Sequence, residues 1–506
     1  MNRQIARLGT VLLVCYAALF VQLNRVQVFG AQALNDNPVN SRAVQGDYDR
    51  ARGTISTADG VIVAQSDMVE GRFEHLRRYP EGDLYSHTVG HLSFAFGSTG
   101  VERVYHDQLA GTADSQEFRE VSDLFIERDT TADVTLTLRH DVQQAARSAL
   151  AATGGTGSVV AVDPRSGAIL AFWSAPSYDP NPLSGHDLDL ARADWNALNA
   201  DPDKPSQAKM YQERFFPGST FKVITAAAAL ELDRVSPTEP VIEPANQYVP
   251  PASTRPIRNF GGSTCGGDLI ELLRVSCNTG FAQIGAELVG PEVLVATAER
   301  FGFNDRVPID LPAPARSNMP TDYGDRLSGD GGPGTVYENS ARLAQVAIGQ
   351  NDVSATPLQM AMVASAIAND GLLREPRVVA EIRDAEGQLL ESNAGGATWR
   401  RAISAATSDV LRQAMIGVVD NGTASRLAVE GFEVGGKTGT AQIGSDPPTS
   451  HAWIIGFAGP SGGPAEVAVA VLVEAQNGVS EQTGGTVAAP VARAVLEAAL
   501  LGSGAG

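Results

Sequence analysis

One stretch of this sequence, residues 217–230, constrains the fold more than any other. It reads Pro-Gly-Ser-Thr-Phe-Lys and continues as Val-Ile-Thr-Ala-Ala-Ala-Ala-Leu. Proline and glycine are typical of a helix start, and the residues after them are apolar on nearly every side of a helix. A helix of this kind must be enclosed by other elements to keep its surface from water. We therefore expect it at the centre of a domain.

Two polar side chains, Ser219 and Lys222, interrupt the apolar surface of this helix. They are three residues apart, so they lie on the same face, one turn from each other. A free lysine has a pKa of about 10.4. Burial and a second nearby cation lower that pKa, which makes Lys222 a candidate base for the Ser219 hydroxyl. The backbone N–H of Ser219, in the first helical turn, is a candidate donor to an oxyanion. The alternative is that Ser219 caps the helix and Lys222 extends to solvent.

A second motif, Ser276-Cys277-Asn278, follows a predicted amphipathic helix at residues 269–275. A loop between two helices projects Ser276 and Asn278 into a cleft. There a hydroxyl relays a proton, and a side-chain amide both donates to and accepts from a substrate backbone. The tripeptide carries no weight alone, because such strings are common.

A third motif occupies residues 435–440 and reads Gly-Gly-Lys-Thr-Gly-Thr, with predicted strands at 451–457 and 467–473 after it. Small residues beside Lys437, such as Gly439, let another backbone come close. An exposed strand edge there binds an extended peptide as one more strand. Lys437 would supply the cation that lowers the pKa of Lys222 and attracts a carboxylate. The alternative is a glycine-rich turn with a solvated lysine.

The chain length, 506 residues, exceeds what one hydrophobic core holds, so at least two domains are expected. The formal net charge of -20 argues against a nucleic-acid partner. Residues 177–212 are expected to form a surface loop, and an Asp-Gly turn at 59–60 joins the first two strands. The local patterns predict strands at 52–55, 58–63, 134–138, 158–163 and 168–173, and helices at 100–111 and 141–150.

The N-terminal segment is strongly apolar between residues 8 and 21 and follows Arg3 and Arg7. This pattern predicts a single-pass membrane anchor with a cytoplasmic N-terminus and the rest of the chain outside. The alternative is a cleaved signal peptide, since Ala31-Gln32-Ala33 fits a cleavage site. Both readings export the body of the protein. In that oxidising compartment Cys265 and Cys277 either form a disulfide or remain two free buried thiols.

The three motifs together, in the order S-x-x-K, S-x-N and K-T-G, resemble those of class B penicillin-binding proteins, the monofunctional D,D-transpeptidases of peptidoglycan synthesis. The compact actinobacterial group associated with cell division is the most similar. The resemblance covers almost the whole chain. Further matching segments are Arg52-Gly53-Thr54-Ile55 in the pedestal, Gly349-Gln350 with residues 356–360 near the site, and His451-Ala452-Trp453 after the motif strand.

The resemblance implies catalytic roles for four side chains. Ser219 resembles the acylated nucleophile, and Lys222 resembles its general base. Ser276 resembles a proton relay that is hydrogen-bonded to both lysines, and Lys437 resembles the lysine that orients this relay. No metal or other cofactor is expected.

The resemblance also implies roles in substrate binding. Asn278 resembles the amide that holds the donor peptide, and Gly439 lies where that peptide passes. Thr438 and Thr440 resemble the hydroxyls that bind its terminal carboxylate. The backbone N–H groups of Ser219 and Thr440 resemble an oxyanion hole.

The fold implied by the resemblance is α+β and multidomain. It comprises a transmembrane anchor at residues 1–29, a β-rich, non-catalytic pedestal or dimerisation-like domain at 30–150, and a transpeptidase domain at 151–502. The last has a central antiparallel sheet flanked by helices, similar to serine β-lactamases.

The implied reaction cross-links peptidoglycan stem peptides through a Ser219 acyl-enzyme, releases D-alanine and is inhibited by β-lactam antibiotics. Alternatives are a serine β-lactamase-like hydrolase and a penicillin-binding receptor that signals. A third is a mainly structural partner of a membrane-embedded SEDS-type glycosyltransferase, which is also the expected partner of the enzyme.

Overall fold

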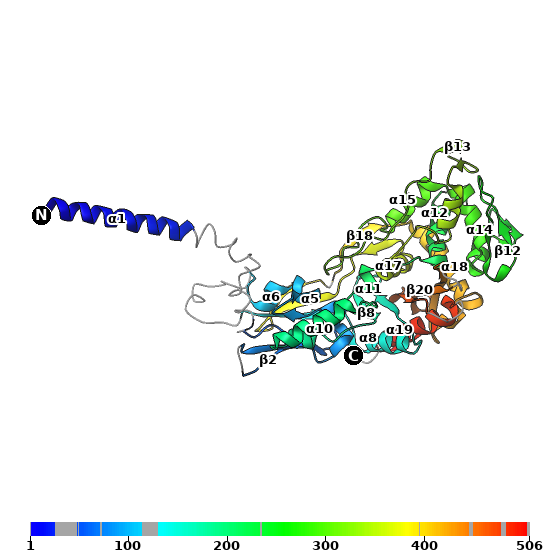
Figure 1. Ribbon diagram of the computed structural model, residues 1–506. Helices are drawn as coiled ribbons and strands as arrows, with labels where there is room; N and C mark the ends of the chain where they lie inside the picture. Colours follow the sequence, from blue (N-terminus) through cyan, green and yellow to red (C-terminus); the bar gives the residue numbers. More distant parts are fainter. Residues whose placement is uncertain are drawn as a thin grey trace.

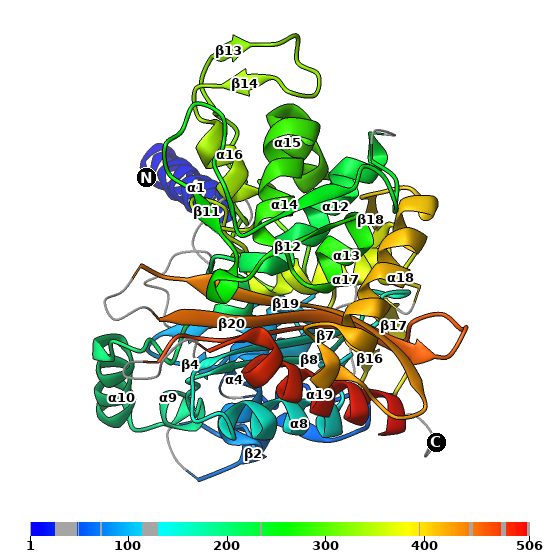
Figure 2. The ribbon, with the colours of Figure 1, turned by 90° about the vertical axis from the view of Figure 1, so that its right-hand side faces the viewer.

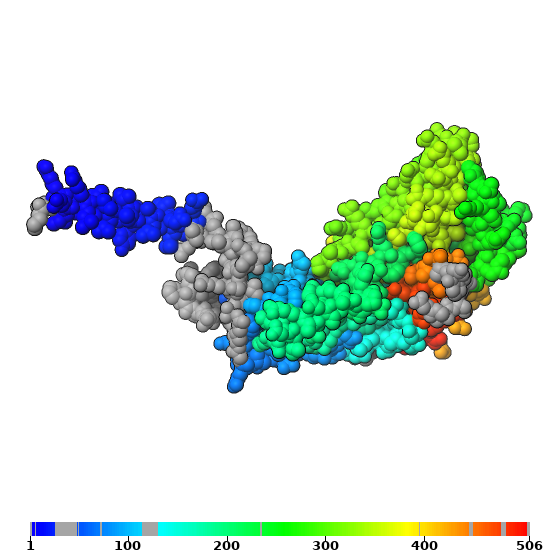
Figure 3. Space-filling model, in the orientation of Figure 1, coloured from blue at the N-terminus to red at the C-terminus, as the bar shows by residue number. Residues whose placement is uncertain are grey.

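The computed structural model describes residues 2–25, 48, 50–70, 73–113, 130–232, 235–393, 395–444, 449–476 and 482–502. Its body is elongated (Figure 1). Residues of the pedestal, in blue, lie at one end of the body, and residues coloured bright green to yellow-green lie at the other (Figure 3). The architecture is α+β, with antiparallel sheets flanked by helices, as the sequence predicted.

The N-terminal helix α1 spans Asn2–Asn24. Its segment Arg3–Asn24 has a mean hydropathy of 1.8, and none of its most apolar stretch is buried against the rest of the structure. Its 23 residues rise about 35 Å, enough to cross the apolar layer of a bilayer. The segment Gly484–Leu501 is also apolar, but half of it is buried because it packs on a sheet of the body, so it is a core element. The signal-peptide site at residues 31–33 lies outside the described residues.

The pedestal is built on a six-stranded sheet in the order β17-β16-β6-β1-β2-β3. The first hairpin, β1 with β2, turns at Asp59-Gly60 as predicted, although both strands begin later than the sequence pattern suggested. Strands β16 and β17 come from a much later part of the chain. Strand β16 pairs with β6 and β17 pairs with β16, which the sequence did not predict. The strands are β1 Ile55–Ser56, β2 Ile62–Met68, β3 His75–Arg78, β6 Ala132–Leu136, β16 Val379–Asp384 and β17 Leu389–Ser392.

A buried carboxylate, Glu102, ties this sheet to the short helices α5 Gly100–Val104 and α6 His106–Ala110. It accepts hydrogen bonds from Arg52 Nε at 2.7 Å and Arg77 Nε at 2.6 Å, and all three side chains are almost fully buried. Burial by itself raises the pKa of Glu102, but the charges and hydrogen bonds of the two arginines outweigh it and lower that pKa. The carboxylate is therefore ionised at neutral pH and holds the two arginines in place.

The expected catalytic domain is built on a five-stranded antiparallel sheet in the order β19-β20-β21-β7-β8. Every residue of β7 and β21 is buried, because helices cover both faces. Helix α17 packs on one face, and α8 with α19 on the other (Figure 2). Strand β19, which carries the Lys437 motif, is an edge strand. The strands and the helices that cover them are β7 Gly157–Val162, β8 Ile169–Ala175, β19 Phe432–Gln442, β20 Ser450–Pro460, β21 Val467–Val473, α8 His140–Ala151, α17 Pro357–Ala368 and α19 Ala489–Leu501. Helix α8 packs on this sheet although it lies almost wholly before residue 151, where the sequence placed the domain boundary.

The central helix predicted at 217–230 begins as the 3-10 turn η4 Gly218–Phe221 and continues as α12 Lys222–Glu231. Every residue from Lys222 to Ala229 is buried, as its apolar surface required. The lobe around it also contains α13 Leu269–Arg274, α14 Asn278–Gln283, η6 Ile284–Val289, α15 Pro291–Arg300, α16 Ser340–Val346 and α18 Ala405–Asn421.

The prediction of a surface loop at residues 177–212 is wrong. This segment forms three helices, α9 Asn181–Ser184, α10 Leu188–Ala200 and α11 Lys209–Gln212. The Asp187 side chain caps α10, since it accepts hydrogen bonds from the N–H groups of Asp189 and Leu190 at 3.1 Å. Within α10 only Ala191 is fully buried, so this helix lies on the surface of the body.

Short elements complete the described structure. In the pedestal region they are η2 Gly82–Tyr85, α4 Ser86–Val89, β4 Leu92–Ser93 and β5 Gly97–Ser98. In the catalytic domain they are β9 Ile242–Ala245, β10 Gln247–Tyr248, β11 Ile257–Arg258, η5 Phe260–Gly262, β12 Cys265–Gly267, β13 Arg326–Ser328, β14 Val336–Tyr337, β15 Leu372–Arg374, β18 Thr398–Arg401, η7 Ser425–Leu427 and η8 Gly484–Ala488.

Candidate active site

Ser219 lies in the first turn of the central helix, in η4. The preceding Gly218 has a φ of +54°, which favours glycine, and its N–H donates to the carbonyl of Gly349 at 2.9 Å. Ser219 is only partly buried, unlike its neighbours Gly218 and Thr220. Its backbone N–H is in the first turn, where helical carbonyl partners are missing. The local geometry therefore presents both a nucleophile and an oxyanion donor.

The Ser276 hydroxyl lies between two buried lysines. Lys437 Nζ donates to Ser276 Oγ at 2.8 Å, and Lys222 Nζ donates to the same oxygen at 3.3 Å. Neither lysine side chain has measurable solvent exposure. The loop that presents Ser276 is tight, with a φ of +58° at this residue. The structure thus brings the three motifs together around a single hydroxyl group.

The electrostatics of this pair favour the uncharged amine. Burial lowers the pKa of Lys222 well below its usual range, and the charge of Lys437 lowers it further. Burial also lowers the pKa of Lys437, to about 7. The ring of Phe281, 5.8 Å from Lys222 Nζ, contributes to this apolar surrounding. A neutral Lys222 is a base, whereas an ordinary surface lysine is a cation.

Lys222 also contacts the third residue of the second motif. Its Nζ donates to Asn278 Oδ1 at 2.7 Å and to the carbonyl of Ser276 at 2.7 Å. The other end of the amide, Asn278 Nδ2, donates to the carbonyl of Arg258 at 3.0 Å. In the resting structure the amide is thus bonded to protein on both sides. Ser219 Oγ, by contrast, has no hydrogen-bond partner among the residues that the structure describes.

The backbones of the Ser219 turn, strand β19 and the loop at residue 349 pack against one another through glycines. A Cβ on Gly218 would lie 2.7 Å from the carbonyl oxygen of Thr440, and one on Gly439 would lie 2.9 Å from that of Pro217. A Cβ on Gly349 would lie 1.9 Å from the oxygen of Gly218. The turn that carries Ser219 is therefore held directly between strand β19 and the 349 loop.

The predicted carboxylate-binding threonines lie on β19. Thr438 is nearly buried, and its hydroxyl oxygen lies 2.7 Å from that of Thr423, an exposed residue in the turn after α18. Thr440 is two residues along the same side of the strand, and its carbonyl accepts from Gln350 Nε2 at 3.4 Å. Sequence reasoning missed Thr423. Its only local signal is Asn421-Gly422, a common helix end.

Cys265 and Cys277 are joined by a disulfide, with the two sulfurs 2.09 Å apart. Of the two states left open by the sequence, the structure contains the bonded one. It links strand β12 to the middle residue of the Ser276 motif. The remaining cysteine, Cys15, is free and lies exposed on α1.

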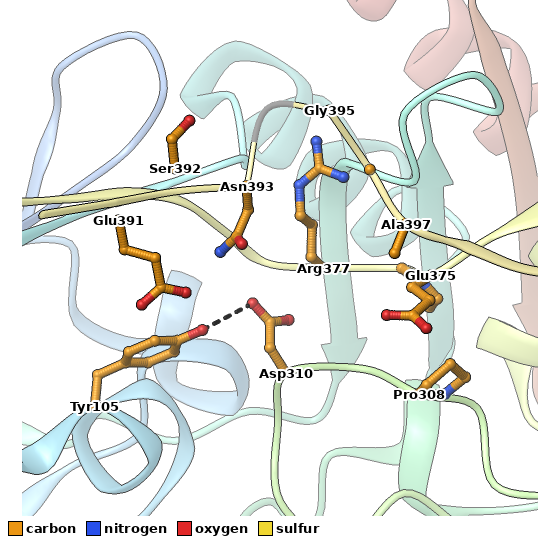
Figure 4. Close-up of a pocket in the computed structure, with 12 residues that line it drawn as sticks. Tyr105, Pro308, Asp310, Glu375, Arg377, Glu391, Ser392, Asn393, Gly395 and Ala397 are labelled. Carbon is orange, nitrogen blue, oxygen red and sulfur yellow. Dashed lines mark hydrogen bonds between the residues drawn. The ribbon is translucent and has the colours of Figure 1, made fainter. Parts of the chain in front are cut away.

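A separate cavity of about 610 Å³ lies between Tyr105, the residue after α5, and segments around Asp310, Arg377 and Glu391 (Figure 4). In it the Tyr105 hydroxyl donates to Asp310 Oδ2 at 3.3 Å. The N–H groups of Val378 and Val379 also donate to the Asp310 carboxylate. None of the residues of the three motifs lines this cavity.

Comparison with known proteins identifies the family. A model described as "Penicillin binding protein transpeptidase domain" matches residues 157–497, and one described as "Penicillin binding protein A dimerisation domain" matches residues 52–134. The peptidoglycan D,D-transpeptidase PbpA of Mycolicibacterium smegmatis is 38% identical over 511 residues, which cover 99% of both chains. The protein of that name in Mycobacterium tuberculosis is 36% identical over 513 residues and covers 99% of this chain and 100% of its own.

Solved structures agree with this result. Penicillin-binding protein A from M. tuberculosis, as an imipenem acyl-enzyme complex, has a TM-score of 0.78 and 35% identity, over 90% of this chain and 99% of that one. Both the sequence match and the structural match extend over the pedestal as well as the catalytic domain. The chain therefore belongs to the class B penicillin-binding proteins, the family of monofunctional D,D-transpeptidases.

Proposed function

We propose that the cleft formed by Ser219, Lys222, Ser276 and Lys437 cross-links peptidoglycan stem peptides. Ser219 Oγ attacks the carbonyl of the penultimate D-alanine, and the amide C–N bond breaks. The terminal D-alanine leaves with a proton on its nitrogen. An amine of a neighbouring stem peptide then attacks the resulting ester, forms the new amide bond and frees the Ser219 hydroxyl. No metal or other cofactor takes part in this sequence.

Each residue of the site has a separate role in this reaction. Neutral Lys222 accepts the Ser219 proton, and the Ser276 hydroxyl passes a proton to the departing nitrogen. Lys437 keeps the Ser276 hydroxyl in place. The N–H groups of Ser219 and Thr440 stabilise the oxyanion, an effect worth roughly 3–4 kcal/mol per donor in other acyl-transfer enzymes.

Substrate binding uses the edge of β19. The donor peptide lies along this strand as an added strand, close to Gly439, and its terminal carboxylate meets the hydroxyls of Thr438 and Thr440. Asn278 exchanges its present partners for the peptide backbone. β-Lactams acylate Ser219 because their amide mimics the same bond.

One observation carries the proposal: a single hydroxyl, that of Ser276, bonds to two fully buried lysines beside the turn that carries Ser219. A structural reading of two buried lysines would predict carboxylate partners, since buried charges are normally paired. Among the described residues the partners of Lys222 and Lys437 are hydroxyl, amide and carbonyl groups. These partners suit an amine that exchanges protons.

The test is the intact mass of the protein after incubation with benzylpenicillin. The wild type should gain the mass of one penicilloyl group, mapped to the peptide that contains Ser219. Ser219→Ala should gain none while unfolding at the same temperature. Ser236→Ala, at an exposed serine, serves as the matched control and should label normally. Labelling of Ser219→Ala would refute the nucleophile assignment. Fast loss of the adduct, with turnover of nitrocefin, would favour the hydrolase alternative.

The placement of the chain follows from its N-terminus. We place residues 1–29 in and beside the membrane with the N-terminus in the cytoplasm, because Arg3 and Arg7 precede the apolar helix. The pedestal, 30–150, and the catalytic domain, 151–502, then lie outside. Digestion of the body by protease added to spheroplasts checks this orientation, and protection would contradict it. A SEDS-type glycosyltransferase is the proposed membrane partner, and it should co-purify in mild detergent.

A further inference from the structure

A residue outside the three motifs touches the predicted carboxylate site. Thr423 Oγ1 lies 2.7 Å from Thr438 Oγ1, a short and well-formed hydrogen bond between two hydroxyls. Thr438 is almost buried, whereas Thr423 is exposed. The pair therefore lies at the boundary between the protein and the space beside β19, where the substrate carboxylate is proposed to bind.

The turn that carries Thr423 is held firmly. The guanidinium of Arg274, at the end of α13, donates to the carbonyl of Asn421 at 2.6 Å. The N–H of Ala424 donates to the carbonyl of Val418 at 3.1 Å. A hydroxyl on such a turn keeps its position before substrate arrives, which is the condition for preorganised binding.

The backbones of two neighbouring segments also pack closely against the turn that carries Thr423. A Cβ on Gly422 would lie 2.7 Å from the carbonyl oxygen of Arg274. A Cβ on Gly485 of η8 would lie 2.5 Å from that of Thr423. The turn thus bridges α13, which leads to Ser276, and η8, which packs beside β19. Thr423 is therefore placed relative to both sides of the cleft.

A hydroxyl has one hydrogen to donate and two lone pairs that accept. If Thr438 gives its hydrogen to Thr423, it turns a lone pair towards the bound carboxylate, and the two oxygens repel. If Thr423 donates to Thr438, the Thr438 hydrogen is left for the carboxylate. A bound carboxylate selects the second arrangement, and a chain of two hydroxyls that ends on an anion is strengthened by its charge.

We propose that Thr423 is a positioning residue that donates to Thr438, directs the Thr438 hydrogen towards the terminal carboxylate of the donor peptide, and so selects donors with a free carboxylate. This inference rests on the proposed function. It adds to it a group from the turn after α18. Thr423 acts through Thr438, so its removal should weaken binding of the carboxylate and leave the chemistry of Ser219 intact.

Two probes, benzylpenicillin and its methyl ester, separate an effect on carboxylate binding from an effect on the chemistry of Ser219. In penicillin, as in the donor peptide, the carboxylate sits on the carbon bonded to the nitrogen of the reacting amide, and the ester lacks this charge. The measurement is the second-order rate constant of acylation of the full chain, together with the thermal unfolding temperature. Thr423→Val keeps the shape of the side chain and removes its hydroxyl. Thr423→Ser restores the hydroxyl, and Thr423→Ala serves if the valine variant does not fold.

The matched control is Thr398→Val on β18, an exposed threonine whose hydroxyl also makes a side-chain hydrogen bond, to Arg374 at 2.8 Å. Thr423→Val should slow acylation by benzylpenicillin about 10-fold and change that by the methyl ester less than about 2-fold. Thr423→Ser should recover most of the loss, and Thr398→Val should change neither rate.

An equal loss with both compounds would show a merely structural role and overturn the inference, as would wild-type rates in Thr423→Val. Failure of the proposed function looks different, because the wild type itself would then not be acylated at Ser219.

Discussion

Gly349 is the position at which one added methyl group should disturb catalysis most. Its φ is +78°, and its carbonyl accepts the N–H of Gly218, the residue before the nucleophile. A Cβ at this position would lie 1.9 Å from the Gly218 oxygen, 2.6 Å from its carbonyl carbon and 2.9 Å from Phe221 Cβ. Two of these three atoms belong to the backbone, so no flexible side chain absorbs the collision.

The magnitude follows from these distances. Real Cβ atoms essentially never come closer than 3.0 Å to such an oxygen, so the contact must open from 1.9 Å by at least 1.1 Å. The displacement falls on the turn that carries Ser219, and a misplacement of about 1 Å costs on the order of 100-fold in rate. The left-handed backbone costs a further ~1–2 kcal/mol of folding stability in alanine. Gly349→Ala should therefore fold, be modestly less stable, and acylate about 100-fold more slowly.

Gly387 offers a matched control. It lies in the turn between β16 and β17 with a φ of +80°, and a Cβ there would meet nothing within 4 Å. Gly387→Ala should therefore lose the same ~1–2 kcal/mol and keep the wild-type rate. Stopped-flow acylation by a fluorescent penicillin and urea unfolding measure both quantities. The reasoning would be refuted if Gly349→Ala acylated within about threefold of wild type, or if Gly387→Ala were equally slow.

Two further predictions concern charge. Because burial and Lys437 lower the pKa of Lys222, acylation should persist well below the ordinary pKa of a lysine and fall as the pH drops through the lowered pKa and protonates the base; a rate that rises as the pH is lowered would contradict this. Glu102→Gln should cost about 3–5 kcal/mol of unfolding free energy by leaving Arg52 and Arg77 unpaired, whereas Glu497→Gln, in an exposed pair, should cost less than about 1 kcal/mol. The pKa of Glu102 is lowered in the fold, so its stabilisation is present above the unfolded-state pKa and is lost as the pH falls through the folded-state pKa; equal unfolding free energies for the two variants would contradict the argument.

Much of the fold was visible in local sequence patterns. The strand pair at 158–163 and 168–173 and the helix at 217–230 have the periodicity and turn residues that their structures require. The three motifs were recognised from residue type and order. These features could be predicted because each depends on residues that are close together in the chain.

Most of the features that were not predicted from the sequence depend on contacts between residues that are distant in the chain. Strand β16 pairs with β6 across more than 200 residues, and nothing within either segment specifies the other. Helix α10 lies between segments rich in proline and glycine, which favoured a loop at residues 177–212 although the helix itself contains apolar residues. Thr423 matters only because α18 ends beside β19, and a threonine after Asn-Gly has no distinguishing local pattern.

The burial of the two lysines has an energetic cost that other parts of the fold must offset. A lysine whose pKa is lowered by folding binds fewer protons in the folded state than in the unfolded state, so stability rises with pH between the two pKa values. For Lys437 this range runs from about 7 to the ordinary value of about 10.4, which means that at neutral pH and below its burial opposes folding. The apolar residues of α12 and α17 and the fully buried strands β7 and β21 offset this cost. The same burial that destabilises the fold makes Lys222 a base, so the reactivity of Ser219 depends on an energetic cost that the surrounding apolar core offsets.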